Sequence, residues 1–368
     1  MLPRVDADTG RGGSPSFEPS LEGLRGVASA IVVVRHSFNA MLLTPATRLA
    51  VAQSPLAVLL NAQGAVQLFF VLSGWVLAGS LERGGEGPPW LRFYARRIAR
   101  IHLPYLAAIA LALAVAALPA VPGAPTPHPV APPFGGIAAL ASYAVFPGNA
   151  GNLLPIDWTL AIELVFSFVM PLMLLAARPG RGLVLLAACV VVLFASPWDM
   201  PRYALDFAFG VVLHRERGAI ARMLARIGAA GRVTLMVGGL VLWVSPLLLW
   251  PVILRGYLLA GWSPVEIGLM GTGAAVLVAG TCDVATLRRG LSVPICQFLG
   301  RISYSLYLVH WTVISLLAPR LVDGTALGNG VLLVAALAAS IALSVPFHRF
   351  IERPAIALGR RLVTPRQI

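Results

Sequence analysis

The sequence predicts an all-α membrane protein, a polytopic bundle of ten transmembrane helices with both termini in the cytoplasm. Three observations lead to this fold class: the apolar composition, the recurrence of apolar runs of bilayer length, and the distribution of arginine. Of the 368 residues, 58% are hydrophobic and 12% are charged, which is about half the charged fraction of a soluble domain. The mean hydropathy is +0.82. An ordinary soluble protein is therefore excluded.

Ten apolar segments are long enough to predict helices that cross a bilayer, which takes about twenty residues. Seven of them are clear: 24–43, 57–79, 101–121, 155–177, 233–253, 299–319 and 329–351. Three are shorter or weaker: 182–197, 201–214 and 265–282. A further run at 134–147 is short and flanked by proline-rich sequence. We interpret that run as a re-entrant or surface segment.

Arginine predicts the orientation of these spans. The chain contains 28 arginines, no lysine and a net charge of +13. With the N-terminus inside, 23 arginines fall in inner segments and four in outer segments, and cytoplasmic loops are expected to carry this excess. An even number of spans places the C-terminus on the same side. In a soluble protein this charge would point to nucleic acid. Here it lies between apolar spans, so we predict a lipid bilayer and no nucleic-acid partner.

The domain organisation is simple. Residues 1–20 are rich in Gly, Pro, Ser and Asp and lack the apolar core of a signal peptide, so we expect a disordered cytoplasmic tail. Residues 21–354 form the transmembrane domain and residues 355–368 a basic cytoplasmic tail. The three cysteines have neither metal-ligand nor disulfide spacing, and we predict no metal. The internal repeat of many transporters is not evident.

The first span carries a cation and an imidazole on one face. Arg25 and His36 are eleven residues apart, which leaves them about 20° apart around a helix and roughly 16 Å apart along it. A histidine in hydrocarbon is costly and usually marks a functional site that faces the bundle interior. The alternative is a histidine that hydrogen-bonds two helices together.

A second basic cluster precedes the third span. Arg97 and Arg100 share a helix face at a spacing of three. Such a cluster can anchor the inner surface or hold a phosphorylated ligand, and charge alone favours the anchor. However, Arg25 lies on the same side, and its distance from His36 is comparable to the reach of a pantetheine arm. Both facts favour a cytoplasmic acyl-CoA with its thioester beside His36.

Other polar residues lie within the apolar spans. Ser73 precedes Gly74, and we interpret this pair as a helix-packing point rather than a nucleophile, because no G-x-S-x-G elbow surrounds it. Glu163 needs a cationic partner in this medium and either fixes helix packing or orients substrate. Ser303, Tyr307 and His310 share one face that either lines an acceptor tunnel or bonds to neighbouring helices. The acceptor-binding candidates are Ser73, Trp158, Tyr304, Tyr307 and His310.

Six blocks in chain order carry a family resemblance: LEGLRGVASAIVVVRH, FFVLSGW, FYARRIARIHLPY, DWTLAIE, FLGRISYSLYLVH and FIERP. They resemble acyltransferase family 3 of the membrane-bound O-acyltransferases, which includes bacterial O-antigen and exopolysaccharide acetylases. The resemblance covers about residues 21 to 354. The family's arginine-x10-histidine pattern falls on Arg25 and His36, and its arginine-x-x-arginine pattern on Arg97 and Arg100. Two residues depart from the usual pattern, since Glu22 stands where aspartate is usual and Trp75 where phenylalanine is usual.

The resemblance implies an O-acetyltransferase of the bacterial inner membrane, with ten spans and both ends inside. It would take acetyl or another short acyl group from cytoplasmic acyl-CoA to a hydroxyl of a carbohydrate or lipid-linked glycan. In this hypothesis His36 is the general base, Glu163 orients or pairs with another group, and Ser73 is the nucleophile if an acyl-enzyme forms. The phosphates of CoA are held by Arg25, Arg97 and Arg100. The alternative is a transporter or flippase of a glycan-linked or acylated substrate. The sequence does not predict the oligomeric state.

Overall fold

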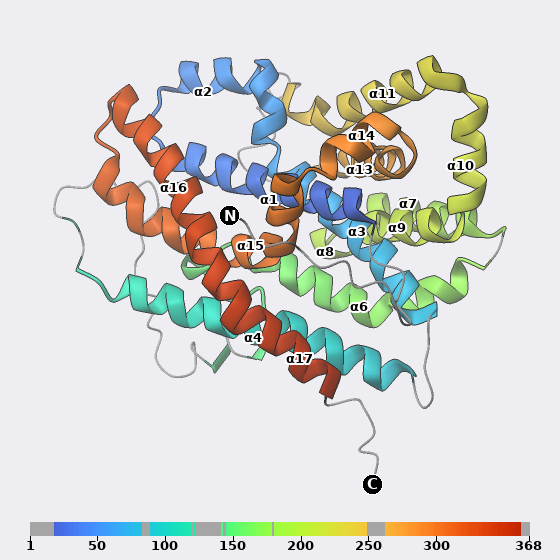
Figure 1. The fold of residues 1–368 in the computed structure, drawn as a ribbon, viewed down its shortest axis with the longest axis horizontal. Coiled ribbons are helices and arrows are strands. Elements are labelled where there is room, and N and C mark those ends of the chain that lie inside the picture. The colour runs from blue at the N-terminus through green and yellow to red at the C-terminus, as the bar shows by residue number, and fades with distance from the viewer. Residues whose placement is uncertain are drawn as a thin grey trace, which may run out of the picture.

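The computed structural model describes residues 18–82, 89–119, 121, 141–142, 145–178, 180–248 and 262–361, and in these ranges the regular secondary structure is helical (Figure 1). Helices corresponding in order to the ten predicted spans are α1 (Pro19–Ala40), α3 (Ala62–Glu82), α4 (Pro89–Ala116), α6 (Trp158–Ala176), α7 (Gly182–Ala195), α9 (Ala204–Arg215), α11 (Gly228–Leu248), α13 (Pro264–Asp283), α15 (Pro294–Leu321) and α16 (Ala326–Phe347). The remaining elements are α2 (Pro45–Ala52), η1 (Pro55–Leu60), η2 (Gly151–Leu153), α8 (Asp199–Arg202), α10 (Arg217–Arg226), α14 (Ala285–Leu291), η3 (His348–Glu352) and α17 (Arg353–Arg361).

Within the described residues, seven helices are long and apolar enough to cross a membrane: α3, α4, α6, α11, α13, α15, and α16 together with its continuation to Arg361. The 14-residue α7 is apolar but short, and α9 has 12 residues. Helix α1 is long enough, but Arg25, Arg35 and His36 reduce its hydropathy. The all-helical, multi-pass membrane fold is confirmed, whereas the count of ten spans and the side of each terminus stay predictions.

Two predictions concern segments near the chain ends and one concerns the Pro-rich loop. Residues 1–17 and 362–368 lie wholly outside the described residues, and so does most of the run at 134–147. The expected disordered tail, half of the basic tail and the re-entrant segment are therefore untested. Helix α1 begins at Pro19, where proline suits the first helical position.

The proline of the FIERP block predicts a helix end at Pro354, at the inner surface, because proline disrupts a helix interior, and this prediction is wrong. The chain passes from α16 through the π-helical turn η3 directly into α17, whose second residue is Pro354. Proline is tolerated in the first turn of a helix, and the wider π turn precedes it. Helix α17 then lies against α4 (Figure 1), so the FIERP block joins the bundle rather than leaving it.

Helices α1 and α15 lie against each other at backbone contact. A Cβ atom at Gly26 would stand 2.6 Å from the backbone nitrogen of Gly300, and one at Gly300 would stand 2.2 Å from the carbonyl oxygen of Glu22. Only glycine fits at both positions, because a real Cβ does not approach backbone atoms so closely. This close packing brings the imidazoles of His36 and His310 within reach of each other.

Candidate active site

A narrow cavity of about 80 Å³ lies among α1, α3, α4, α6 and α15. We call it the arginine cavity. Seven of the ten site residues predicted from the sequence line it, and they are Arg25, Ser73, Arg97, Arg100, Glu163, Tyr304 and Tyr307. The other three, His36, Trp158 and His310, lie elsewhere. The structure therefore brings together residues that are far apart in the chain, and the three predicted phosphate-binding arginines line the same cavity.

Glu163 has the cationic partner that the sequence requires. Its Oε1 lies 2.6 Å from Nη2 of Arg97, and the Nε of Arg97 donates to Ser167 Oγ at 3.1 Å. Ser167 in turn donates to the carbonyl oxygen of Glu163 at 2.7 Å. The Arg97 and Glu163 side chains are only 11% and 23% exposed. This arrangement fixes the Arg97 guanidinium against α6 and neutralises one charge.

The other two arginines of the cavity are not neutralised in this way. Among the described residues, neither Arg25 nor Arg100 makes a hydrogen bond or an ion pair. The lining residues thus supply three guanidinium groups and one carboxylate, Glu163. In a region of low dielectric constant this excess of positive charge favours an anionic ligand.

Ser73 and Gly74 face different surroundings in the structure. A Cβ at Gly74 would lie 2.3 Å from the carbonyl oxygen of Phe207 on α9, so Gly74 is the predicted packing point. Ser73 faces the other way and lines the arginine cavity. Its hydroxyl is 3.4 Å from Glu163 Oε1, which makes it a weak donor to the ion pair.

His36 and His310 form a hydrogen-bonded pair between α1 and α15. His36 Nδ1 lies 2.8 Å from His310 Nε2, and the two rings are within 11° of parallel. His310 is fully buried, and its Nδ1 lies 2.7 Å from the carbonyl oxygen of Tyr307. A carbonyl can only accept, so the proton of neutral His310 is on Nδ1, and its Nε2 accepts from His36 Nδ1. The lone pair of neutral His36 is then on Nε2.

Tyr307 connects this histidine pair to the arginine cavity. Its ring lines the cavity, and its ring centroid is 5.7 Å from that of His310. Its hydroxyl is 2.8 Å from Thr159 Oγ1 on α6. His36 does not line the arginine cavity, and it is connected to this cavity through His310 and Tyr307.

The comparison with known proteins decides the class of this site. A family model described as an acyltransferase domain matches residues 18–349. The chain belongs to the acyltransferase 3 family. It is also similar to the acyltransferase MdmB of Streptomyces mycarofaciens, with 26% identity over 391 aligned positions that cover 93% of each chain. No solved structure matches significantly. The protein is thus a membrane enzyme that transfers acyl groups, which confirms the resemblance seen in the six blocks.

Two carboxylates of this acyltransferase have structural roles that sequence reasoning missed. Glu352 Oε2 accepts from Ser305 Oγ at 2.6 Å and contacts His348 Nδ1 at 2.9 Å, which joins η3 to α15. Asp157 Oδ2 accepts from Tyr105 and from the backbone nitrogens of Gly148 and Ala150, which fixes the start of α6. Both residues stand in quoted blocks, FIERP and DWTLAIE, but neither pattern reveals its partners.

Trp158 lies in a second, larger cavity of the acyltransferase, on the far side of α6 from the arginines. This cavity has a volume of about 510 Å³, and we call it the aromatic cavity. Its aromatic lining residues are Phe146, Trp158, Tyr203 and Trp262. In the part of the chain that the structure describes, no group of three or more His, Cys, Asp or Glu side chains could hold a metal ion.

Proposed function

We propose that this acyltransferase moves an acetyl group from cytoplasmic acyl-CoA to a hydroxyl of a carbohydrate or glycan-like acceptor, with His36 as general base. The observation that carries this proposal is the hydrogen-bond chain from the Tyr307 carbonyl through His310 to His36. This chain selects the tautomer of His36 that has its lone pair on Nε2, and a general base needs such a nitrogen held in one orientation.

The donor site in this proposal is the arginine cavity. Arg25 and Arg100 face the cavity with no carboxylate partner among the described residues, and guanidinium groups bind phosphate oxygens through paired N–H bonds. Arg97 is already hydrogen-bonded to Glu163 and Ser167. It therefore adds positive charge and shapes the cavity, whereas Arg25 and Arg100 supply the N–H groups that bind phosphate. The phosphates would sit among these groups while the pantetheine arm runs along α1 toward His36.

The reaction is a direct transfer. The acceptor oxygen attacks the thioester carbonyl as His36 Nε2 takes the hydroxyl proton, and the carbon–sulfur bond then breaks. The imidazolium returns its proton to the leaving thiolate, so that the products are an ester and free CoA thiol. An acyl-enzyme on Ser73 is less well supported, because its hydroxyl contacts Glu163, a carboxylate already engaged by Arg97, and not a free base.

The comparisons favour an acyltransferase over the alternative of a transporter. The family that the chain belongs to is one of acyltransferases, and the relative that covers 93% of the chain is named an acyltransferase. An enzyme must release free thiol for each group transferred, whereas a transporter moves its substrate without consuming the thioester. The two functions therefore differ in a product that can be measured directly.

The cytoplasmic location of the donor site follows from the arginine distribution of the loops. With that orientation α1 enters from the inner face at Arg25, and the same face receives the end of α3 and the start of α4. We propose the bacterial inner membrane and cytoplasmic termini on this basis. Reporter fusions at Ile368 that are active only in the cytoplasm would support this topology, and activity only on the opposite face would overturn it.

The function is tested by thiol release from acetyl-CoA. The purified protein in detergent is incubated with acetyl-CoA, with and without a crude glycan acceptor, beside the variants His36→Ala and Arg25→Ala. We expect acceptor-stimulated release in the wild type and its loss in both variants. Full activity of His36→Ala would overturn the base assignment. If the wild type released no thiol with any acyl-CoA and acceptor, the proposed transfer from acyl-CoA would fail.

A further inference from the structure

The aromatic cavity has the chemistry of a sugar-binding site. It opens beside the first residues of α3, α6 and α13, where Gly148 and Asn149 are exposed. Its volume of about 510 Å³ lies within the roughly 300 to 1,000 Å³ of small-molecule sites. Polar side chains that line it beside the aromatic rings are Gln63, Asn149 and Asp199.

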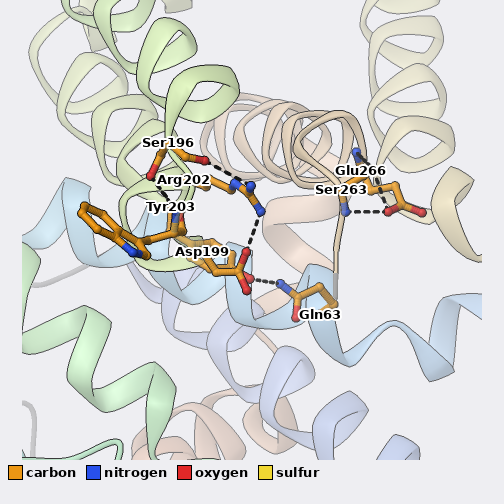
Figure 2. A network of polar contacts seen from close by, with 8 residues as sticks. Gln63, Ser196, Asp199, Arg202, Tyr203, Ser263 and Glu266 are labelled. Atoms are coloured by element: carbon orange, nitrogen blue, oxygen red, sulfur yellow. Dashed lines mark hydrogen bonds and ion pairs between the residues drawn. The ribbon is translucent and has the colours of Figure 1, made fainter. Parts of the chain in front are cut away.

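Hydrogen bonds to neighbouring residues hold Asp199 and Gln63 of this cavity in place (Figure 2). Arg202 donates to Asp199 Oδ1 at 2.5 Å and to the carbonyl oxygen of Ser196 at 3.1 Å. Gln63 donates to the hydroxyl of Tyr203 at 2.8 Å. The Asp199 side chain is nevertheless 66% exposed, so its carboxylate is oriented by Arg202 and still accessible to a ligand.

The helix cap at the start of α13 stabilises the part of the cavity lining that carries Trp262. Ser263 and Glu266 form a capping box at the start of α13, with Ser263 N donating to Glu266 Oε2 at 2.8 Å (Figure 2). Trp262 immediately precedes this cap and lines the cavity. The ring of Trp158 lies 5.7 Å from that of Tyr203, centroid to centroid. The aromatic faces therefore stand on elements that are themselves capped or hydrogen-bonded.

We propose that the aromatic cavity binds a pyranose ring of the acceptor, with Trp158 and Trp262 against the C–H faces of the sugar and Asp199 accepting from its hydroxyls. A pyranose presents an apolar face of C–H groups and an edge of hydroxyls, which match indole rings and a carboxylate or amide respectively. This inference rests on the proposed function, because it assigns the acceptor of the same transfer reaction.

Neighbouring residues of α6 line the aromatic cavity and the arginine cavity. Trp158 lines the aromatic cavity, and the next residue, Thr159, lines the arginine cavity, where its Oγ1 meets the Tyr307 hydroxyl at 2.8 Å. Phe70 also lines the arginine cavity, and its ring is 5.4 Å from that of Tyr203. The two cavities therefore adjoin different faces of α6 at its first turn, and a longer acceptor bound in the aromatic cavity would have to reach the donor past this turn.

The test measures sugar binding without catalysis. Saturation-transfer NMR records the binding of a panel of methyl pyranosides, namely glucoside, galactoside, mannoside and N-acetylglucosaminide, to the full chain in lipid nanodiscs. The variants are Trp262→Ala, Trp158→Ala and Asp199→Asn, with Trp262→Phe as the conservative replacement. Trp198→Ala is the matched control, because Trp198 is 72% exposed and does not line the cavity. Calorimetry with acetyl-CoA on the same samples reports whether the donor site is intact.

We expect at least one pyranoside to bind, at least tenfold weaker binding in the Trp262→Ala and Trp158→Ala variants, and partial recovery in Trp262→Phe. The Trp198→Ala control should bind as the wild type does, and acetyl-CoA binding should stay within twofold in all variants. If no pyranoside binds, or if binding does not depend on Trp158 and Trp262, the inference is overturned whether or not thiol is released. If sugar binds in this way but no thiol is ever released, the proposed transfer from acyl-CoA fails and the sugar site stands.

Discussion

His36 Nδ1 lies 2.8 Å from His310 Nε2, and His310 Nδ1 lies 2.7 Å from the carbonyl oxygen of Tyr307. This order of contacts orients one imidazole through another. A buried histidine that is hydrogen-bonded to a backbone carbonyl on its own helix has little freedom to rotate or to change tautomer. In our proposal His310 is therefore a positioning residue, and His36 is the group that touches the reacting hydroxyl.

Replacing His310 by alanine should lower kcat by about 100-fold while leaving the KM for acetyl-CoA within about twofold, because a misoriented base impairs proton transfer but not donor binding. His310→Gln should retain more activity, since its amide oxygen can accept from His36 Nδ1. Thiol release at saturating donor and acceptor measures both. The matched control is His102→Ala on α4, which lies outside both cavities. Equal losses in His310→Ala and His310→Gln would contradict the positioning role.

The uneven pairing of the three arginines predicts unequal effects on the donor. Arg25→Ala and Arg100→Ala should each weaken acetyl-CoA binding by about tenfold, which corresponds to about 1.4 kcal/mol, and the effect should shrink at high salt. Arg96→Ala should have no effect, because Arg96 is exposed and bonds only to the Arg92 carbonyl among the described residues. Calorimetric titration of the three variants with acetyl-CoA is the measurement. Similar losses for Arg96 and Arg100 would indicate a surface anchor instead of a phosphate site.

The sequence predicts the class of this fold well, because apolar length and arginine bias report directly on the bilayer. It also predicts that Arg25, Arg97 and Arg100 hold one ligand and that Glu163 has a cationic partner. What it leaves open is pairing: a helical spacing shows which residues share a face, but not which face of another helix it meets. The hydrogen bond between His36 and His310 depends on glycine contacts between α1 and α15. The two histidines are 274 residues apart in the chain, so no local pattern relates them.

Local sequence does not show how distant elements pack together. For this reason the expectation at Pro354 is wrong and the aromatic cavity is not predicted. A proline two residues after a π turn looks in sequence like a helix end, although the turn in fact carries the chain into α17. The aromatic cavity gathers Gln63 from α3, Trp158 from α6, Asp199 from α8 and Trp262 from the segment before α13. No local pattern relates these residues, and only Trp158 stands in a block that carries the family resemblance.

The ion pair between Arg97 and Glu163 should be a stability element. Glu163→Gln leaves a guanidinium that is mostly buried without its partner, and we expect a loss of about 1–3 kcal/mol. The double variant Arg97→Gln with Glu163→Gln should be less destabilised than the sum of the two single variants, because neither charge is then left alone. Thermal unfolding of the purified proteins in detergent gives the coupling. Strict additivity of the two single effects would show that the 2.6 Å contact contributes nothing to the fold.

The glycine contact between α1 and α15 links stability to the histidine pair. Gly300→Ala places a methyl group 2.2 Å from the Glu22 carbonyl oxygen, so the helices must separate, and we expect a loss of about 1–3 kcal/mol. Gly330→Ala is the matched control, since this residue also lies within a helix, α16, and a Cβ there would meet no heavy atom within 4 Å. That variant should be unchanged or more stable by about 0.4–1 kcal/mol.

Because His36 and His310 lie on the two helices that separate, Gly300→Ala should also lower kcat for thiol release well below that of Gly330→Ala at a temperature where both are folded. A Gly300→Ala protein with wild-type melting temperature and activity would show that the close approach of α1 and α15 does not set the geometry of the pair.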